Sequence, residues 1–444
     1  MYSLQKIPGF TDIVENLSDK ERSSEICKNN GLRLISYYNS KAKQNQYILK
    51  YDKNIITEQN TDSLGLSRSI ILNEKKEVLS FAPPKSYNNI DLIESKSNIT
   101  FYSIEDFAEG TMIHLYYVNT GEEENEEENE EKKGYWDIST RSNIGGNNYF
   151  YNNGDKNTKT FKEMFDETCE LANFDLNKLP KQYCYNFVLK HPLNRIVQPV
   201  IQPCLILTNV YKISNYFVHK VANSMILNFV TQSNHFGIIH TYETFSSDQD
   251  INVMDKIGYY TNLYCSDNTN SMIQGIVIQT ACENEEKRYK IRNPNYEIVK
   301  KLKGNNPRLQ FHYLSLRKEN KVTDYIKFYG KAKEFSEFRT QMHKVTSQLY
   351  KNYISCYIKK EKPLIEYSEQ FRTHMFNLHH NIYLTKLKPN KENINFEIIK
   401  NYVNDLEIVH QLYFINYQLR EQKKEDLKLK TIFSNEEKLE EVTL

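Results

Sequence analysis

The residues best suited to chemistry in this sequence lie within 104–113, where Glu109 and Gly110 directly precede an apolar run. Glycine lets the backbone approach a ligand closely, because it carries no side chain. A carboxylate and backbone amides at such a turn can meet a bound nucleotide. An ordinary turn into a strand is the alternative interpretation, since Glu-Gly pairs are common in turns.

A second candidate is the basic stretch 287–308, which holds eight Lys or Arg residues and one acid, Glu297. So dense a cationic stretch fits contact with phosphate groups. A solvated strand and helix surface is the alternative. Tyr289 and Tyr296 lie within the stretch and could stack on bases, although we expect them to pack against a sheet.

Several kinds of site are excluded by missing motifs. The sequence contains neither a GxxxxGK phosphate loop nor a GxSxG nucleophile motif. Its seven cysteines form no Cys-x-x-Cys pair, and no His cluster has Cys or Asp partners at ligand spacing. We therefore expect reduced thiols and no metal site. No apolar run reaches membrane-spanning length, so we expect a cytoplasmic protein with no membrane partner.

Charge is distributed unevenly along the 444 residues, although the formal net charge is only +1. Residues 122–133 hold eight Glu and two Lys, so the rest of the chain carries +7. The Glu-rich run is too charged to pack, and we expect a solvated loop over 121–134. The mildly basic remainder permits a polyanionic partner.

Short runs of strand-forming residues separated by polar turns predict a mostly antiparallel sheet in the first two thirds of the chain. One helix is expected within it at 160–171, where apolar residues recur at helical spacing. The expected strands cover 32–38, 46–51, 66–72, 78–81, 111–118, 134–140, 185–189, 204–207, 272–278 and 288–291.

The apolar spacing changes from two to three and four after about residue 317, which predicts helices. We expect them around 335–349, 364–378 and 396–409, the last as one long helix. The fold class is therefore α+β, with an antiparallel-sheet domain over 1–318, an all-α domain over 319–421 and a charged tail over 422–444.

Five segments, taken in order, resemble the motifs of the bacteriophage tRNA-repair type of ATP-dependent RNA ligase, within the covalent nucleotidyltransferase superfamily. More narrowly, the chain looks like RNA-ligase-like proteins of large cytoplasmic DNA viruses. The segments are 66–72, 107–113, 186–197, 274–278 and 287–293, and the resemblance runs from about 64 to 311. It implies an ATP-grasp-like nucleotidyltransferase domain and an RNA end as substrate.

The resemblance also implies a site. In the family a lysine attacks the α-phosphate of ATP, Mg²⁺ offsets phosphate charge, and basic residues hold the phosphates. On this sequence the phosphate contacts fall on Arg68, Lys287 and Lys290, and Arg141 fits the element after the nucleophile motif. Glu109 and Gly110 match the acidic residue and glycine of that motif.

The sequence departs from the family at three positions. The nucleophile position, three residues before Gly110, is Phe107, which has no amine. A family glutamate falls on Val188, and another falls on Gln274. The nucleophile and two acidic groups are thus lost, while the phosphate-facing cations Arg68, Lys287 and Lys290 remain.

Three hypotheses follow. The first is a degenerate ligase that binds RNA or a nucleotide without adenylating itself, within a viral RNA-processing or transcription complex in a viral factory or virion. The second is an active RNA ligase or nucleotidyl transferase that uses ATP and Mg²⁺ through a displaced nucleophile, for which Lys85 after Pro83-Pro84 is the candidate. The third is a purely structural subunit. RNA is the expected partner, and the helical domain could contact further proteins.

Overall fold

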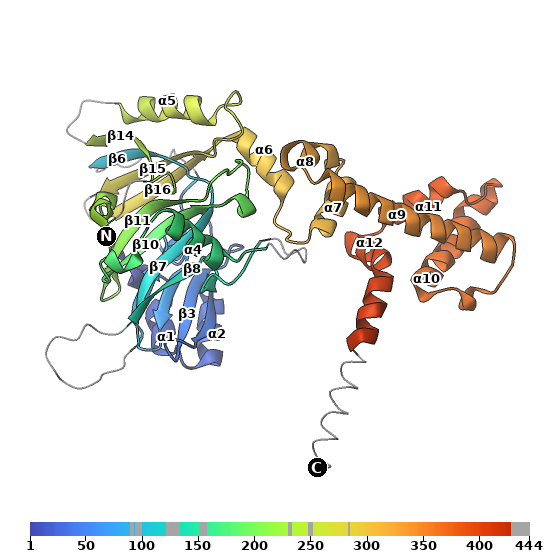
Figure 1. Ribbon diagram of the computed structural model, residues 1–444, viewed down its shortest axis with the longest axis horizontal. Helices are drawn as coiled ribbons and strands as arrows, with labels where there is room; N and C mark the ends of the chain where they lie inside the picture. The colour runs from blue at the N-terminus through green and yellow to red at the C-terminus, as the bar shows by residue number, and fades with distance from the viewer. Residues whose placement is uncertain are drawn as a thin grey trace, which may run out of the picture. The chain divides into compact units, whose positions relative to one another are not determined.

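The computed structural model describes residues 1–88, 93, 100–120, 134–150, 158–229, 233–246, 252–282 and 285–427. The chain divides into two compact units, Met1–Lys301 and Leu302–Leu444, whose elements are labelled in Figure 1. The predicted Glu-rich loop, up to residue 133, lies outside the described residues, as does the charged tail from 428 onward.

The largest sheet of unit 1 has the strand order β1-β12-β11-β10-β7-β8-β9, with β13 paired to β11 off this path. Helix α4 (Phe161–Leu171) packs on one face, where its Phe165 meets Phe187. A capping box between Thr160 and Glu163 starts this helix. The strands are β1 (Tyr2–Ser3), β7 (Thr111–Asn119), β8 (Gly134–Thr140), β9 (Asn143–Ile144), β10 (Tyr183–Lys190), β11 (Cys204–Ser214), β12 (Phe217–Val221) and β13 (Phe236–Ile238).

A second sheet of four antiparallel strands, in the order β2-β3-β4-β5, carries α1 (Phe10–Glu15) and α2 (Lys20–Asn29). Its buried side chains share one core with Tyr116 and Tyr211 from the large sheet. Helix α2 begins at Asp19, whose carboxylate accepts the N–H of Arg22. The strands are β2 (Leu32–Asn39), β3 (Gln44–Tyr51), β4 (Ile70–Asn73) and β5 (Val78–Phe81).

A third sheet, in the order β14-β6-β15-β16, is covered on one face by α5 (Val253–Cys265). Ile257 of α5 packs with Ile278 and Tyr289 of this sheet. Helix α6 (Pro294–Lys303) follows the last strand directly. The strands are β6 (Phe101–Asp106), β14 (Thr241–Ser246), β15 (Gly275–Cys282) and β16 (Glu285–Arg292).

Unit 2 is built from helices around its own core, which includes Phe335, Met342, Leu349, Met375 and Ile399. The aromatic and aliphatic stripe of the sequence is therefore largely internal. The α-helices are α7 (Leu309–Lys318), α8 (Val322–Tyr329), α9 (Ala332–Tyr353), α10 (Glu369–Asn377), α11 (Phe396–Asp405) and α12 (Ile408–Ile415), with π-helical turns at Ile354–Ile358 and Leu378–Leu387.

The predicted fold class is confirmed: antiparallel sheets with a few helices precede a helical region. The structure divides the chain at Lys301/Leu302, whereas the sequence predicted 318/319. The difference arises because Leu309 and Tyr313 pack into the helical core. Within the described ranges, no helix combines the length and apolar character needed to cross a bilayer.

Two predicted elements differ in extent. The strand expected over 66–72 begins only at Ile70, because 64–66 form a 3-10 turn in which Ser67 Oγ donates to Leu64 O. The helix expected over 396–409 is two helices that break at Leu406. There the Gln411 amide donates to the carbonyl oxygens of Asn404 and Leu406, which have no helical partners at the end of α11.

Candidate functional site

A cavity of about 310 Å³ lies in unit 1 between the large sheet and the sheet that ends in β16. We call it the Lys290 cavity. Met112, Val188 and Asn209 line it from the large sheet, and Gly110 and Gln274 line it from the turns before β7 and β15. A volume near 300 Å³ is at the lower end of small-molecule sites and is large enough for a mononucleotide.

Five basic side chains line the Lys290 cavity: Arg68, Arg288, Lys290, Arg292 and Lys300. Burial, and then the charges of Arg288 and the other three, hold the pKa of Lys290 well below its usual value. Burial and the Arg288 charge lower the pKa of Arg68 to about 10, so this side chain stays charged at neutral pH. The cations repel one another. Arg68, Arg288 and Lys290 are partly buried, whereas the side chains of Arg292 and Lys300 are 44% and 41% exposed.

The cations differ in their partners. Arg292 and Lys300 both contact Glu297 on α6, at 3.6 and 3.4 Å. Within the described residues, Arg68 and Lys290 have no carboxylate at ion-pair distance. Arg68 donates only a long hydrogen bond of 3.4 Å to Pro83 O. Together with Arg288, whose pKa is also lowered by burial, these are the side chains whose charge an anionic ligand would compensate most.

Phe107 takes part in this arrangement directly. The Lys290 ammonium lies 4.5 Å from the centre of the Phe107 ring, a cation–π contact. The Phe107 N–H donates to Gly275 O at 3.2 Å, which fixes the start of the turn. Phe107 thus lines the cavity, and the Lys290 ammonium lies over the face of its ring.

Glu109 does not line the cavity. Its carboxylate is 3% exposed and accepts the backbone N–H groups of Val197 and Gln198, at 3.1 and 3.0 Å. It therefore fastens the segment after β10 to the turn before β7. Gly110 does line the cavity, with φ +154°, and a Cβ there would lie 2.5 Å from Leu189 O. The close approach of two backbones explains this glycine.

Lys287 and Lys290 do not meet, although the sequence assigned both to the phosphates. Side chains of a strand alternate between its faces, so residues three apart point to opposite sides. Lys290 and its neighbours Arg288 and Arg292 line the Lys290 cavity. Lys287 instead forms an ion pair of 2.6 Å with Asp62.

The remaining predicted residues divide in the same way. Val188 and Gln274 line the Lys290 cavity. Arg141 lies outside it, stacked 4.7 Å over the Tyr51 ring, and its Nε donates to Arg68 O at 3.3 Å. It holds the backbone of Arg68. Lys85 lines a different cavity, and its Nζ donates to Ser86 O at 3.3 Å.

Tyr289 and Tyr296 are both 1% exposed. Tyr289 packs in the core of the third sheet, as expected, whereas Tyr296 also lines the Lys290 cavity. Sequence reasoning missed Asp106, Arg288, Arg292 and Lys300 as cavity residues. The basic residues at 288, 290 and 292 have the spacing of one strand face, and this spacing was the available signal.

The Lys290 cavity does not fit a carboxylate-held metal ion. Mg²⁺ takes oxygen ligands, usually from carboxylates, waters and substrate phosphates. Asp106 is the single carboxylate among the described residues that line the cavity, and burial raises its pKa. Across the described ranges no group of three or more His, Cys, Asp or Glu side chains could hold a metal ion.

Comparison with known proteins gives no family assignment from sequence: no family model and no curated protein matches the chain. Three solved structures share part of the fold. Two forms of an archaeal ATP-dependent RNA ligase match with TM-scores of 0.42 and 0.41 at 8% and 10% identity, over 75% and 76% of this chain and 82% of each ligase. A protein assigned as an ATP-dependent DNA ligase from Aquifex aeolicus matches with TM-score 0.38 and 11% identity, over 75% of this chain and 80% of that one.

Proposed function

We propose that the Lys290 cavity binds a phosphate-bearing nucleotide, free or at the end of an RNA, without forming a lysyl-AMP bond at the turn before β7. One observation carries this proposal. Arg68 and Lys290 face a mononucleotide-sized cavity with no carboxylate at ion-pair distance among the described residues. An anion bound there would offset the free-energy cost of removing both cations from water, because it would form charge-assisted hydrogen bonds with them.

The absence of self-adenylation follows from the same cavity. Phe107 supplies no nucleophile, and its ring covers one side of Lys290. Val188 and Gln274 supply no carboxylate. The lining is therefore better suited to binding phosphate groups than to binding the Mg²⁺ ion that usually accompanies them. In this proposal binding is retained without catalysis: the cavity offers groups that hold phosphate, and the positions that the resemblance assigns to catalysis are Phe107, Val188 and Gln274.

Incubation with α-labelled ATP tests both parts. We expect label to be retained on the native protein at low salt and to be released on denaturation. Arg68→Ala should lose the retained label, whereas Lys162→Ala, which changes an exposed lysine paired with Asp166, should keep it. A wild-type protein that retains no label at low salt would contradict the proposal and favour a purely structural subunit.

The position of Lys290 favours one other function, an active nucleotidyl transferase with a displaced nucleophile. An amine of lowered pKa in a nucleotide cavity can attack phosphorus. Its Nζ would form the bond to the α-phosphorus and lose a proton to solvent, while pyrophosphate leaves with the electrons of the broken P–O bond. Label that survives denaturation and disappears in Lys290→Arg would establish this function. Loss in Lys85→Ala instead would support the nucleophile predicted from sequence.

RNA as the polymer, and a place in a viral RNA-processing or transcription complex, are supported by the motif resemblance of the sequence. The cavity itself recognises the phosphate group common to both ligands. Competition separates them: a 5′-phosphorylated RNA oligonucleotide should displace labelled AMP, and the same oligonucleotide with a 5′-hydroxyl should displace it more weakly. Equal displacement by both would place RNA binding elsewhere on the chain.

A further inference from the structure

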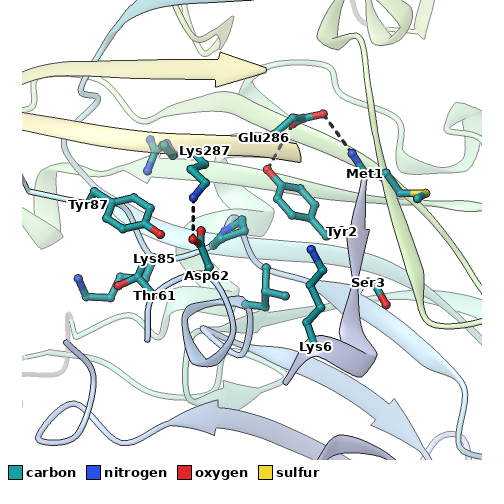
Figure 2. A pocket seen from close by; sticks show the side chains of 13 residues that line it. Met1, Tyr2, Ser3, Lys6, Thr61, Asp62, Lys85, Tyr87, Glu286 and Lys287 are labelled. Atoms are coloured by element: carbon teal, nitrogen blue, oxygen red, sulfur yellow. Dashed lines mark hydrogen bonds and ion pairs between the residues drawn. The ribbon is translucent and has the colours of Figure 1, made fainter. Parts of the chain in front are cut away.

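A second, smaller cavity of about 50 Å³ lies beside β16 in unit 1, on the side of Lys287. We call it the Lys287 cavity, and Figure 2 shows its lining. Lys6, Lys85, Lys287 and Arg288 supply four cationic side chains, against the carboxylates of Asp62 and Glu286. A single ordered water needs about 10–15 Å³ by this kind of measure, so there is room for one tetrahedral oxyanion.

The two cavities share a wall. Pro83 lines the Lys290 cavity, while the next residue, Pro84, lines the Lys287 cavity. Arg288 lines both, and its guanidinium donates to Ser86 Oγ at 3.2 Å. Its Nε is buried, and no described residue forms a hydrogen bond with it. An anion held in one cavity is therefore next to an anion held in the other.

Lys287 and Asp62 form an ion pair in the Lys287 cavity, and their side chains differ in exposure to solvent. The Lys287 side chain is 11% exposed and lies 5.5 Å from the centre of the Tyr87 ring. The Asp62 side chain that pairs with it is 60% exposed. Figure 2 shows the carboxylate of Asp62 reaching Lys287, with Lys6 extending toward the same space. The lysine lies within the wall, whereas the carboxylate, which also meets the Tyr87 hydroxyl, is largely exposed to solvent.

We propose that the Lys287 cavity is a second phosphoryl subsite, in which a phosphate group replaces the Asp62 carboxylate as the partner of Lys287. A carboxylate and a phosphate offer the ammonium the same kind of acceptor oxygen, and phosphate carries more charge. Asp62 then keeps the buried lysine paired until the ligand arrives. This inference extends the proposed function. It depends on that function only in assuming that a nucleotide occupies the neighbouring Lys290 cavity.

The ligand chemistry has two sources. The phosphoryl group is either the terminal phosphate of a nucleoside triphosphate or the next phosphate along an RNA whose 5′ end occupies the Lys290 cavity. Both reach across the wall of Pro83 and Pro84, and both require a second phosphate that AMP lacks.

The test compares AMP, ATP, pyrophosphate and a 5′-phosphorylated RNA tetranucleotide in equilibrium titrations of the full chain. For a ligand that uses the subsite, Lys287→Met should weaken binding by about tenfold, and Asp62→Asn should strengthen it by about threefold, because a competing carboxylate is removed. AMP affinity should change in neither variant. An effect on ATP alone identifies the terminal phosphate, and an effect on RNA alone identifies the polymer.

Opposite signs in the two variants are the decisive feature. A merely structural ion pair would make Asp62→Asn and Lys287→Met weaken binding together, with matching losses of thermal stability, and this result would overturn the subsite. The pair Lys162→Met and Asp166→Asn, from an ion pair on α4, is the matched control. If AMP fails to bind but pyrophosphate shows the opposite signs, the proposed function fails and the subsite stands.

Discussion

The two faces of β16 place lysines in contrasting surroundings only three residues apart. Lys287 has a carboxylate at 2.6 Å, whereas Lys290 has an aromatic ring at 4.5 Å and four basic neighbours. The first arrangement satisfies the charge within the protein. The second leaves the charge of Lys290 available for a bound anion. This arrangement lowers the stability of the ligand-free fold but favours anion binding.

The largest expected effect of this contrast is on binding. Lys290→Glu should weaken binding of a 5′-phosphorylated RNA oligonucleotide by about 100-fold or more, because it loses a charge-assisted contact and adds repulsion. Lys287→Glu should weaken it by about tenfold, since this lysine already has a partner. Fluorescence anisotropy at low salt measures both. Equal losses would remove the distinction between the two faces.

The next largest expected effect is on stability, through the close approach of β15 and β16 at Gly275. Gly275 has φ +136°, and a Cβ there would lie 2.1 Å from Ile291 O. We expect Gly275→Ala to lower the free energy of unfolding by about 2–4 kcal/mol through steric overlap and backbone strain. Gly237→Ala is the control, because no atom of the described residues lies within 4 Å of its added Cβ. Urea unfolding of both variants checks this, and similar midpoints would contradict it.

Replacing the two lysines should also change the free energy of unfolding in opposite directions. Lys290→Met removes a partly buried charge that no carboxylate pairs within the described part of the chain, and we expect a gain of about 1–2 kcal/mol in the ligand-free protein. Lys287→Met breaks a pair whose acid is already exposed, and we expect a loss of at most about 1 kcal/mol. Chemical denaturation without phosphate buffer measures the difference. A loss in Lys290→Met would show that its charge is already satisfied in the fold.

The smallest expected effect is a pH dependence. The pKa of Lys290 lies below its ordinary value, so the amine loses its proton at a lower pH in the folded protein than in the unfolded chain. Between these two pKa values the unfolded state holds more protons, and stability rises with pH. A bound phosphate favours the ammonium, so affinity falls as pH rises through the same window. Lys290→Arg should flatten the affinity profile, and an unchanged slope would assign it to another group.

Local patterns predicted most of the sheets. Period-two runs identified β2, β3, β5, β7, β8 and β10, and period-three-and-four spacing identified α4 and the positions of α9, α10 and α11. β6 and β14 were missed, because their mixed polar residues pack against a sheet that only tertiary structure assembles. The break at Leu406 was missed for a similar reason. It depends on Gln411, which follows the break in sequence and satisfies its carbonyl groups.

The site was predictable only in part. Arg68, Gly110, Val188, Gln274 and Lys290 were found from motif order, and the fold brings them to one cavity. The sequence assigned Lys287 and Lys290 to one site, but a spacing of three places them on opposite faces of the strand, and they line different cavities. A motif does not show whether its acidic residue faces a ligand. Glu109 is the example, since its carboxylate holds the N–H groups of Val197 and Gln198.

The most direct test of the central claim is a calorimetric titration of ATP into the full chain at low salt, without added metal. The account predicts saturable binding at one site, abolished in the Arg68→Ala/Lys290→Ala double variant and unchanged in Lys162→Ala. Intact ATP should be recovered after denaturation. No saturable binding by the wild-type protein, or equal binding by the double variant, would contradict the assignment of the Lys290 cavity as a phosphate-binding site.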